Sequence, residues 1–185
     1  INLGAGGPAS GYRASGRVRV SGEDGAGQPV DLLCSYALQG IPAAEDSLLF
    51  SGDGNLELHV PAGGVPGDAY AVVVGGNALP GLPPGSLAPV GTAYEIRFSG
   101  SLTGLTRPGL LRLHYHPDLL RDRETTALRL YTWYAAEQTW ANLDGTLNER
   151  DESLSRAVTR TGIYVLMADG ELGNRIYLPL VLKEY

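Results

Sequence analysis

The sequence predicts an all-β fold: an antiparallel β-sandwich of about ten strands with almost no helix. The chain has 26 glycines and 12 prolines spread along its 185 residues, which suits many short strands joined by turns. Apolar and polar residues alternate with the period of two that a half-buried strand requires. A hydrophobic content of 43% and a charged content of 18% are ordinary for a globular domain long enough to bury one core.

Each predicted strand rests on a short alternating stretch. In "GRVRVSG", for example, Val18 and Val20 point to one face and the arginines to the other. The stretch "AYAVVVGG" is apolar throughout, which predicts a strand buried on both faces. The strands predicted up to residue 117 are "GRVRVSG" (16–22), "GNLELHVPAG" (54–63), "AYAVVVGG" (69–76), "TAYEIRFSG" (92–100) and "GLLRLHYHP" (109–117).

The stretch "ALRLYTWYAAEQTWANLDG" at 127–145 contains both tryptophans of the chain. Its central "AAEQ" is compatible with a helix, but the flanks alternate, since Leu130 and Thr132 face away from Tyr131 and Trp133. β-Branched and aromatic residues on both sides of a polar turn favour strands. We therefore predict a hairpin here.

Four more elements complete the expected fold. We predict one strand over "AVTRTGIYVLMA" (157–168) and a last strand in "RIYLPLVLK". The only helical candidate is "PDLLRDRE", one or two turns from Pro117. The proline-rich "PGLPPGSLAPV" (80–90) is expected to be a stiff crossover loop.

Three regions follow from this reading. Residues 1–47 would form an amino-terminal arm and the first strands, residues 48–168 the core of the sandwich, and residues 169–185 a linker and a carboxy-terminal strand. The linker 169–175 can reach about 23 Å at about 3.3 Å per residue.

The carboxy-terminal strand is a possible assembly strand because both of its faces are apolar. Pro179 has no N–H to donate, which favours an edge or a bulge. Two alternatives stay open: closure of the chain's own sandwich, or pairing with another subunit, for which the glycine-rich arm from Ile1 could be the counterpart. The strand comprises Ile176, Leu178, Leu180 and Leu182 on one face and Tyr177, Pro179 and Val181 on the other.

The order of several motifs resembles a known family. The motifs are "VPAG" at 60–63, "APVG-x-x-Y" at 88–94, "Y-x-P-x-x-L" at 115–120, the hairpin "LRLY…W", and "Y-x-L" at 164–166. Over about residues 54–168 the chain resembles bacterial relatives of the zonula-occludens/uncoordinated β-sandwich domain of ankyrins and netrin receptors. The resemblance implies a β-sandwich in a secreted or surface protein.

Some members of that family cut their own chain at a His-Phe-Ser step before the last strand. The corresponding residues here are Arg160, Thr161 and Gly162, so self-cleavage is not expected. The tail "IYLPLVLKEY" also looks like the terminal segment of many exported proteins of filamentous bacteria. The chain starts at Ile1 rather than Met, which fits a product whose export signal has been removed or, equally, a trimmed chain.

Composition argues against some partners. A net charge of −6 disfavours nucleic acid, and the chain has no run of 18 apolar residues with which to span a membrane. Cys34 is the single cysteine, so no intrachain disulfide forms; we expect a buried, inert thiol rather than a nucleophile.

Candidate chemistry is sparse, and each motif has a structural explanation. His114 and His116, with His59, could bind a metal, or they could be packed or solvent-facing histidines. "GDGNLE" places Asp53, Asn55 and Glu57 as in a calcium loop or, more simply, a turn before a strand. "LGAGGPA" (3–9) imitates part of a dinucleotide motif without the strand and helix that the motif needs. No cofactor is expected.

The aromatic residues of the hairpin are the other candidate site. Tyr131, Trp133 and Trp140 could stack on sugar rings, although cross-strand packing is the more usual role of such residues. We therefore expect a non-enzymatic extracellular or cell-surface structural protein (a surface-layer, adhesive or filament subunit) that self-associates through edge strands or termini. The alternative is a carbohydrate- or ligand-binding module of a surface protein.

Overall fold

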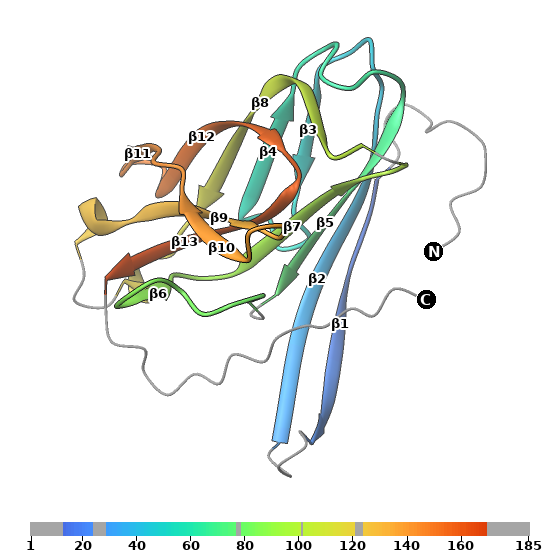
Figure 1. Cartoon of the computed structure of the whole chain (residues 1–185). Helices are drawn as coiled ribbons and strands as arrows, with labels where there is room; N and C mark the ends of the chain where they lie inside the picture. The colour runs from blue at the N-terminus through green and yellow to red at the C-terminus, as the bar shows by residue number, and fades with distance from the viewer. Residues whose placement is uncertain (1–12, 24–28, 77–78, 101, 121–123, 170–185) are drawn as a thin grey trace.

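The computed structural model describes residues 13–23, 29–76, 79–100, 102–120 and 124–169. It confirms the all-β prediction, because about 60% of the described residues are in strands and 4% are helical, in two antiparallel sheets packed against each other (Figure 1). The described residues form β1 Arg13–Glu23, β2 Pro29–Ile41, β3 Ser47–Phe50, β4 Leu56–Val60, β5 Ala69–Gly76, β6 Leu87–Pro89, β7 Ala93–Phe98, β8 Gly104–His114, β9 Arg129–Tyr134, β10 Thr139–Asn142, β11 Thr146–Asn148, β12 Ser153–Arg160 and β13 Gly162–Asp169, with 3₁₀ turns η1 Pro117–Leu119 and η2 Thr125–Ala127.

The two sheets differ in size. The large sheet has the strand order β1-β2-β5-β7-β13-β9-β10, with β6 paired to β13. The small sheet has the order β11-β12-β8-β4-β3. The predicted hairpin is confirmed as β9 and β10, in which Trp133 pairs with Trp140.

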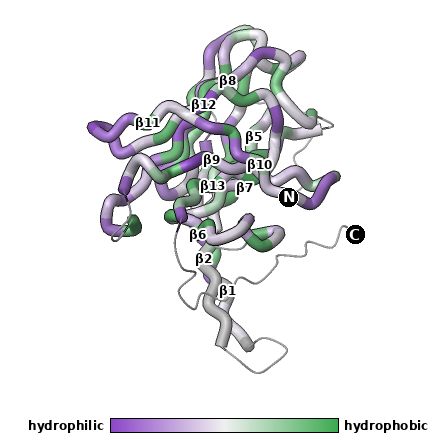
Figure 2. Tube along the Cα trace, turned by 60° about the vertical axis from the view of Figure 1, so that its left-hand side comes forward, coloured by the Kyte–Doolittle hydropathy of each residue, from purple (hydrophilic) through white to green (hydrophobic). Residues whose placement is uncertain are grey.

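The main core lies between the sheets and is built by the predicted alternation. In β4 the burial pattern places Leu56, Leu58 and Val60 inside, and in β13 the inner residues are Tyr164 and Leu166. Burial of such side chains stabilises the fold by about 1.5–3 kcal/mol each. Hydrophilic residues gather in the connections, for example near β11 (Figure 2).

Two sequence-based expectations were wrong. β5 is not buried on both faces: Ala71 and Val73 are buried, whereas Val72 and Val74 are half-buried on the outer face of the large sheet. The single strand expected over 157–168 is two strands, β12 in the small sheet and β13 in the large sheet, because the chain changes sheets at Thr161 and Gly162. The one or two helical turns expected from Pro117 correspond, in the described residues, to the single 3₁₀ turn η1.

The outer face of the large sheet is partly covered by the proline-rich segment after β5. A second, smaller hydrophobic cluster forms there beneath Leu79 and Leu87; its other members are Ala93, Tyr131, Trp133, Trp140, Ile163, Val165 and Met167. We call the part of the sheet over β13, β9 and β10 the covered face. The segment is more than a crossover loop, since it also contains β6.

Residues 176–182, the possible assembly strand, lie outside the described residues, as do the arm from Ile1 and the motif at 3–9. Within the described ranges, the structure contains no helix with the length and apolarity needed to cross a membrane.

Candidate functional site

The most distinctive feature of the fold is a two-stranded ribbon that extends beyond the sandwich (Figure 1). β1 pairs with β2 without interruption from Arg13–Gln39 to Glu23–Pro29. β2 pairs with β5 only from Ser35 to Ile41, so residues 18–23 and 29–34 have only each other as partners in the described structure. We call these two stretches the ribbon.

The base of the ribbon is anchored to the small sheet. The Arg13 guanidinium donates to the Leu48 carbonyl at 3.3 Å and lies 5.5 Å from the centre of the Phe50 ring. Gln39 donates to the same carbonyl at 2.8 Å. On the opposite face the Tyr36 ring lies over Gly16, where a Cβ would be 2.6 Å from the Tyr36 hydroxyl. These contacts hold the direction in which the ribbon leaves the body.

β1 is an edge strand along its whole length of 11 residues, because β2 is its one neighbour among the described strands. Among the described strands, none pairs with the backbone N–H and C=O groups on its outer side. An unprotected edge of this kind is a template for strand addition. An isolated two-stranded ribbon is also marginally stable in water, so a third strand would stabilise it.

The aromatic residues of the hairpin pack against the proline-rich segment. Tyr131 is 9% and Trp140 8% exposed, and the Trp133 and Trp140 rings meet edge to face with centres 5.3 Å apart. The Trp140 indole donates to the Gly81 carbonyl at 3.3 Å. The packing alternative thus explains Tyr131 and Trp140, and Trp133 is the partly exposed member of the three.

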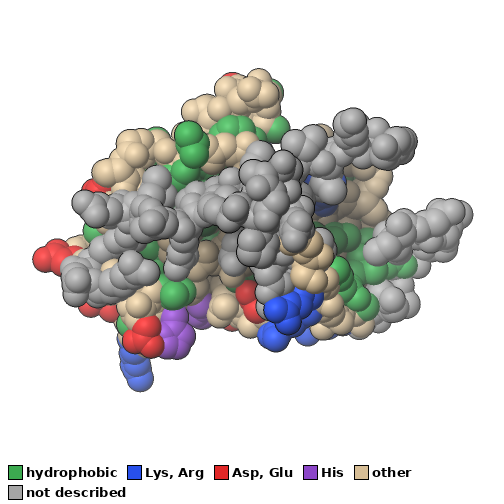
Figure 3. Space-filling view, turned by 90° about the horizontal axis from the view of Figure 1, so that it is seen from below, with side chains coloured by type: hydrophobic (Ala, Val, Ile, Leu, Met, Phe, Trp, Pro, Cys, Tyr) green, Lys and Arg blue, Asp and Glu red, His purple; other side chains and the backbone are tan. Residues whose placement is uncertain are grey.

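A cleft of about 410 Å³ opens at the end of the sandwich where β4 and β7 begin and β8 ends. Histidine side chains lie beside carboxylates at this end of the molecule (Figure 3). Its polar lining comes from separate elements: Asn55, Glu57, Tyr94, His114, His116, Asp151 and Glu152.

The polar groups of the cleft are held by one another. Glu57 accepts from Arg112 at 3.0 Å and lies 3.5 Å from Nε2 of His114, whose Nδ1 is 3.2 Å from the Asp151 carbonyl. The buried Tyr94 hydroxyl donates to Asp53 at 2.7 Å. Burial, followed by the Asp53 carboxylate, raises the pKa of Tyr94 well above its usual value of 10.

The residues considered as metal or calcium ligands are only partly brought together. His114 and His116 line the same cleft, but β8 ends at His114, so His116 is not on the strand as expected. His59 instead lies 3.6 Å from Asp46. Asp53 accepts from Ser51 and from the Asn55 backbone, as in a turn. In the described part of the chain, His, Cys, Asp and Glu form no group of three or more arranged to hold a metal ion.

Comparison with known proteins does not place the chain in a family. Neither the family models nor the curated proteins that were searched contain a match. The resemblance to the zonula-occludens/uncoordinated domain therefore rests on the motifs quoted above.

Sequence reasoning missed two features of the site. The first is the full extent of the ribbon. The stretch "PVDLLCSYALQGI" (29–41) alternates only weakly, and this weak alternation is the one signal that could have predicted β2. The second is the contact of Gly81 with the tryptophans, for which a proline-rich segment between two strands gives no local signal.

Proposed function

We propose that this chain is a non-enzymatic structural module of an extracellular or cell-surface protein, related to the domain family it resembles, that assembles with copies of itself through the open edge of β1. The observation that carries the proposal is the ribbon, in which β1, a strand of 11 residues, has β2 as its one neighbouring strand among the described residues. Pairing there would extend the large sheet from one subunit to the next.

The charge of β1 favours an antiparallel partner with carboxylates. Arg13, Arg17 and Arg19 lie on one face of the strand. A partner strand that places carboxylates opposite this row would form favourable cross-strand pairs. A second copy of β1, in the antiparallel register that pairs position 13 with position 23, sets Arg17 opposite Arg19, which limits the strength of that contact.

Electron microscopy of the protein taken from its source tests the proposal. Polymers or sheets of regular spacing are the expected result. A monodisperse monomer at high concentration in native extracts contradicts it.

The cleft favours a second function, the binding of a glycan or another small polar ligand. Its volume is within the range of about 300–1,000 Å³ that small-molecule sites occupy. Glycan-array binding that is lost in His116→Ala would support the cleft, and binding lost in Trp133→Ala would support the hairpin. Binding that survives both substitutions would exclude both sites.

A further inference from the structure

The outer face of the large sheet has an apolar half that no described element covers. Val18 is 50% and Tyr36 37% exposed, and their neighbours on this face are half-buried. We call this surface the open face; its residues are Ala14, Val18, Cys34, Tyr36, Leu38, Tyr70, Val72 and Val74.

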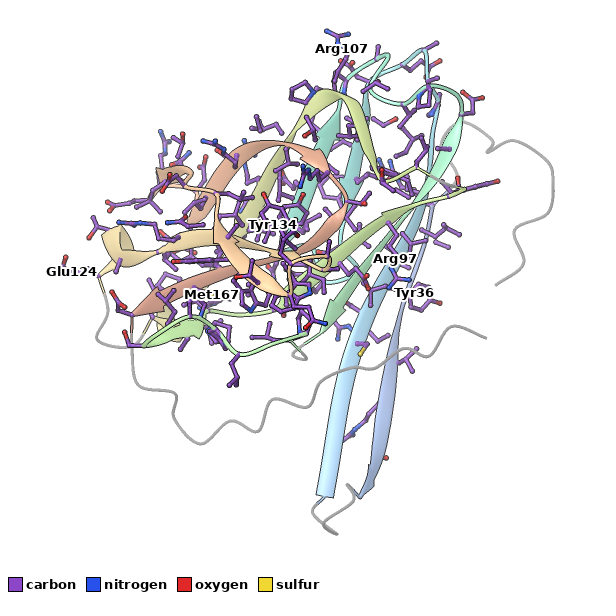
Figure 4. All side chains as sticks on the ribbon, in the orientation of Figure 1. Tyr36, Arg97, Arg107, Glu124, Tyr134 and Met167 are labelled. Carbon is purple, nitrogen blue, oxygen red and sulfur yellow. The ribbon has the colours of Figure 1, made fainter. Side chains whose placement is uncertain are left out.

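Strand register makes the open face continuous. Val18 pairs with Cys34, Tyr36 with Val74, and Leu38 with Val72. The next strand, β7, ends the apolar surface with Glu95 and Arg97, which pair with Val74 and Val72 and form an ion pair at 2.6 Å. Tyr36 and Arg97 project to the same side in Figure 4.

The two halves of this sheet face thus differ in whether a described segment covers them. The covered face lies under the proline-rich segment with Pro80, Pro83 and Pro84, which packs on the tryptophans before its end pairs with β13 as β6. The open face has the same apolar character but no such cover among the described residues. A contiguous apolar surface of this kind marks a binding surface in a soluble protein.

The chain carries a segment suited to the open face directly after β13. The strands β13, β7, β5 and β2 are neighbours, so three inter-strand spacings, about 14 Å, separate β13 from β2. Register places Tyr164 level with Ser35, so Asp169 also lies four residues, about 13 Å, beyond the level of Cys34, and the direct path between them is about 19 Å. The linker 169–175 spans about 23 Å when fully extended, which is enough for this crossing. Residues 176–182 then supply four aliphatic side chains on one face: Ile176, Leu178, Leu180 and Leu182.

We propose that residues 176–182 pack across the open face of their own chain as an apolar cover. Pro179 fits this role better than a place in a ladder, because a covering segment does not need the N–H that proline lacks. The arrangement repeats the way in which the first proline-rich segment covers the other half of the face. It involves one chain only and does not depend on the proposed assembly.

The single cysteine provides the test, since Cys34 lies within the open face. In the monomer fraction of the full chain, we expect Cys34 to react slowly with a charged thiol reagent, because residues 176–182 shield it. In the double variant Leu178→Asp/Leu180→Asp the reaction should be about tenfold faster or more, because the cover opens more often. The matched control Lys183→Gln should react like the parent. Equal rates in the parent and the double variant would overturn the proposal.

Cross-linking identifies which chain provides the cover. Cysteines introduced singly at positions 176–182 are joined to Cys34 with a short bismaleimide. We expect intrachain products at Ile176, Leu178, Leu180 or Leu182 and few at Tyr177 or Val181. Predominantly interchain products would mean that a neighbour provides the segment, and products without this alternation would mean that it does not pack as a strand; either result contradicts the proposal.

Discussion

Tyr164 stabilises the point at which the chain passes from the small sheet to the large one. Its hydroxyl donates to the carbonyl of Arg160, the last residue of β12, at 2.6 Å, and Gly162 lies between them with a φ of 152°. We expect Tyr164→Phe to lower the free energy of unfolding by about 1–2 kcal/mol, because it leaves the Arg160 carbonyl without this donor. Urea unfolding measures the effect, with Tyr36→Phe at the exposed surface as control. A loss no larger than that of the control would show that the hydrogen bond is unimportant.

Two buried tyrosines make the fold sensitive to alkaline pH. Burial raises the pKa of Tyr164 to about 12, and burial together with Asp53 raises that of Tyr94 above its ordinary 10. Because the folded-state pKa values exceed the unfolded ones, their stabilisation is complete below about pH 10 and is lost as pH rises through the folded-state values. Unfolding free energies measured from pH 8 to 12 should fall above pH 10, and less steeply in Tyr94→Phe. An identical slope in that variant would contradict this assignment.

At the scale of elements, the covering of the tryptophans depends on Gly81. A Cβ there would lie 2.6 Å from the Trp133 ring, and the Gly81 carbonyl accepts from Trp140. We expect Gly81→Val to displace the segment, to lower the unfolding free energy by about 1–3 kcal/mol, and to shift tryptophan fluorescence to the red. Leu82→Ser, at a neighbouring side chain that is 80% exposed, is the control. Unchanged fluorescence in Gly81→Val would mean that the segment does not shield the indoles.

Alternation within a single stretch predicted strands correctly where the prediction did not depend on which strand lies beside it. The hairpin of β9 and β10 and the strands β5 and β7 were predicted because period two is a property of each stretch alone. The change of sheet at Gly162 was not predicted. The stretch "AVTRTGIYVLMA" alternates through this residue, and β12 and β13 are distinguished only by lying in different sheets. The burial of β5 was overestimated because apolarity cannot show which of two apolar faces is covered.

The candidate site was less predictable than the fold for the same reason. The sequence identified Tyr131, Trp133 and Trp140 as a cluster, but the segment that packs on them comes from residues about 50 positions earlier in the chain. The ribbon depends on where β5 stops pairing with β2, at Ser35, which is a tertiary property. The carboxy-terminal segment was recognised from its two apolar faces, and its place remains a proposal.

At the scale of the whole molecule, two surfaces of the same sheet have no covering strand or segment among the described residues: the backbone edge of β1 and the open face beside it. The edge offers hydrogen bonds to another subunit, whereas the open face offers apolar area to a segment of the same chain. Substitutions can alter each surface without the other, so that self-assembly and the packing of residues 176–182 can be tested independently.

Paired proline substitutions in β1 test the central claim, assembly through this edge, most directly. The N–H groups of adjacent residues point to opposite sides of a strand, so one of Arg17→Pro and Val18→Pro removes an N–H facing β2 and the other removes one at the open edge. Amide exchange in the parent monomer identifies the edge residue as the faster one, and Arg17→Ala and Val18→Ala control for the side chains. Sedimentation should show that the parent assembles and that the edge-side proline variant stays a folded monomer. A parent that remains monomeric at high concentration, or an edge-side variant that assembles like the parent, would contradict the claim.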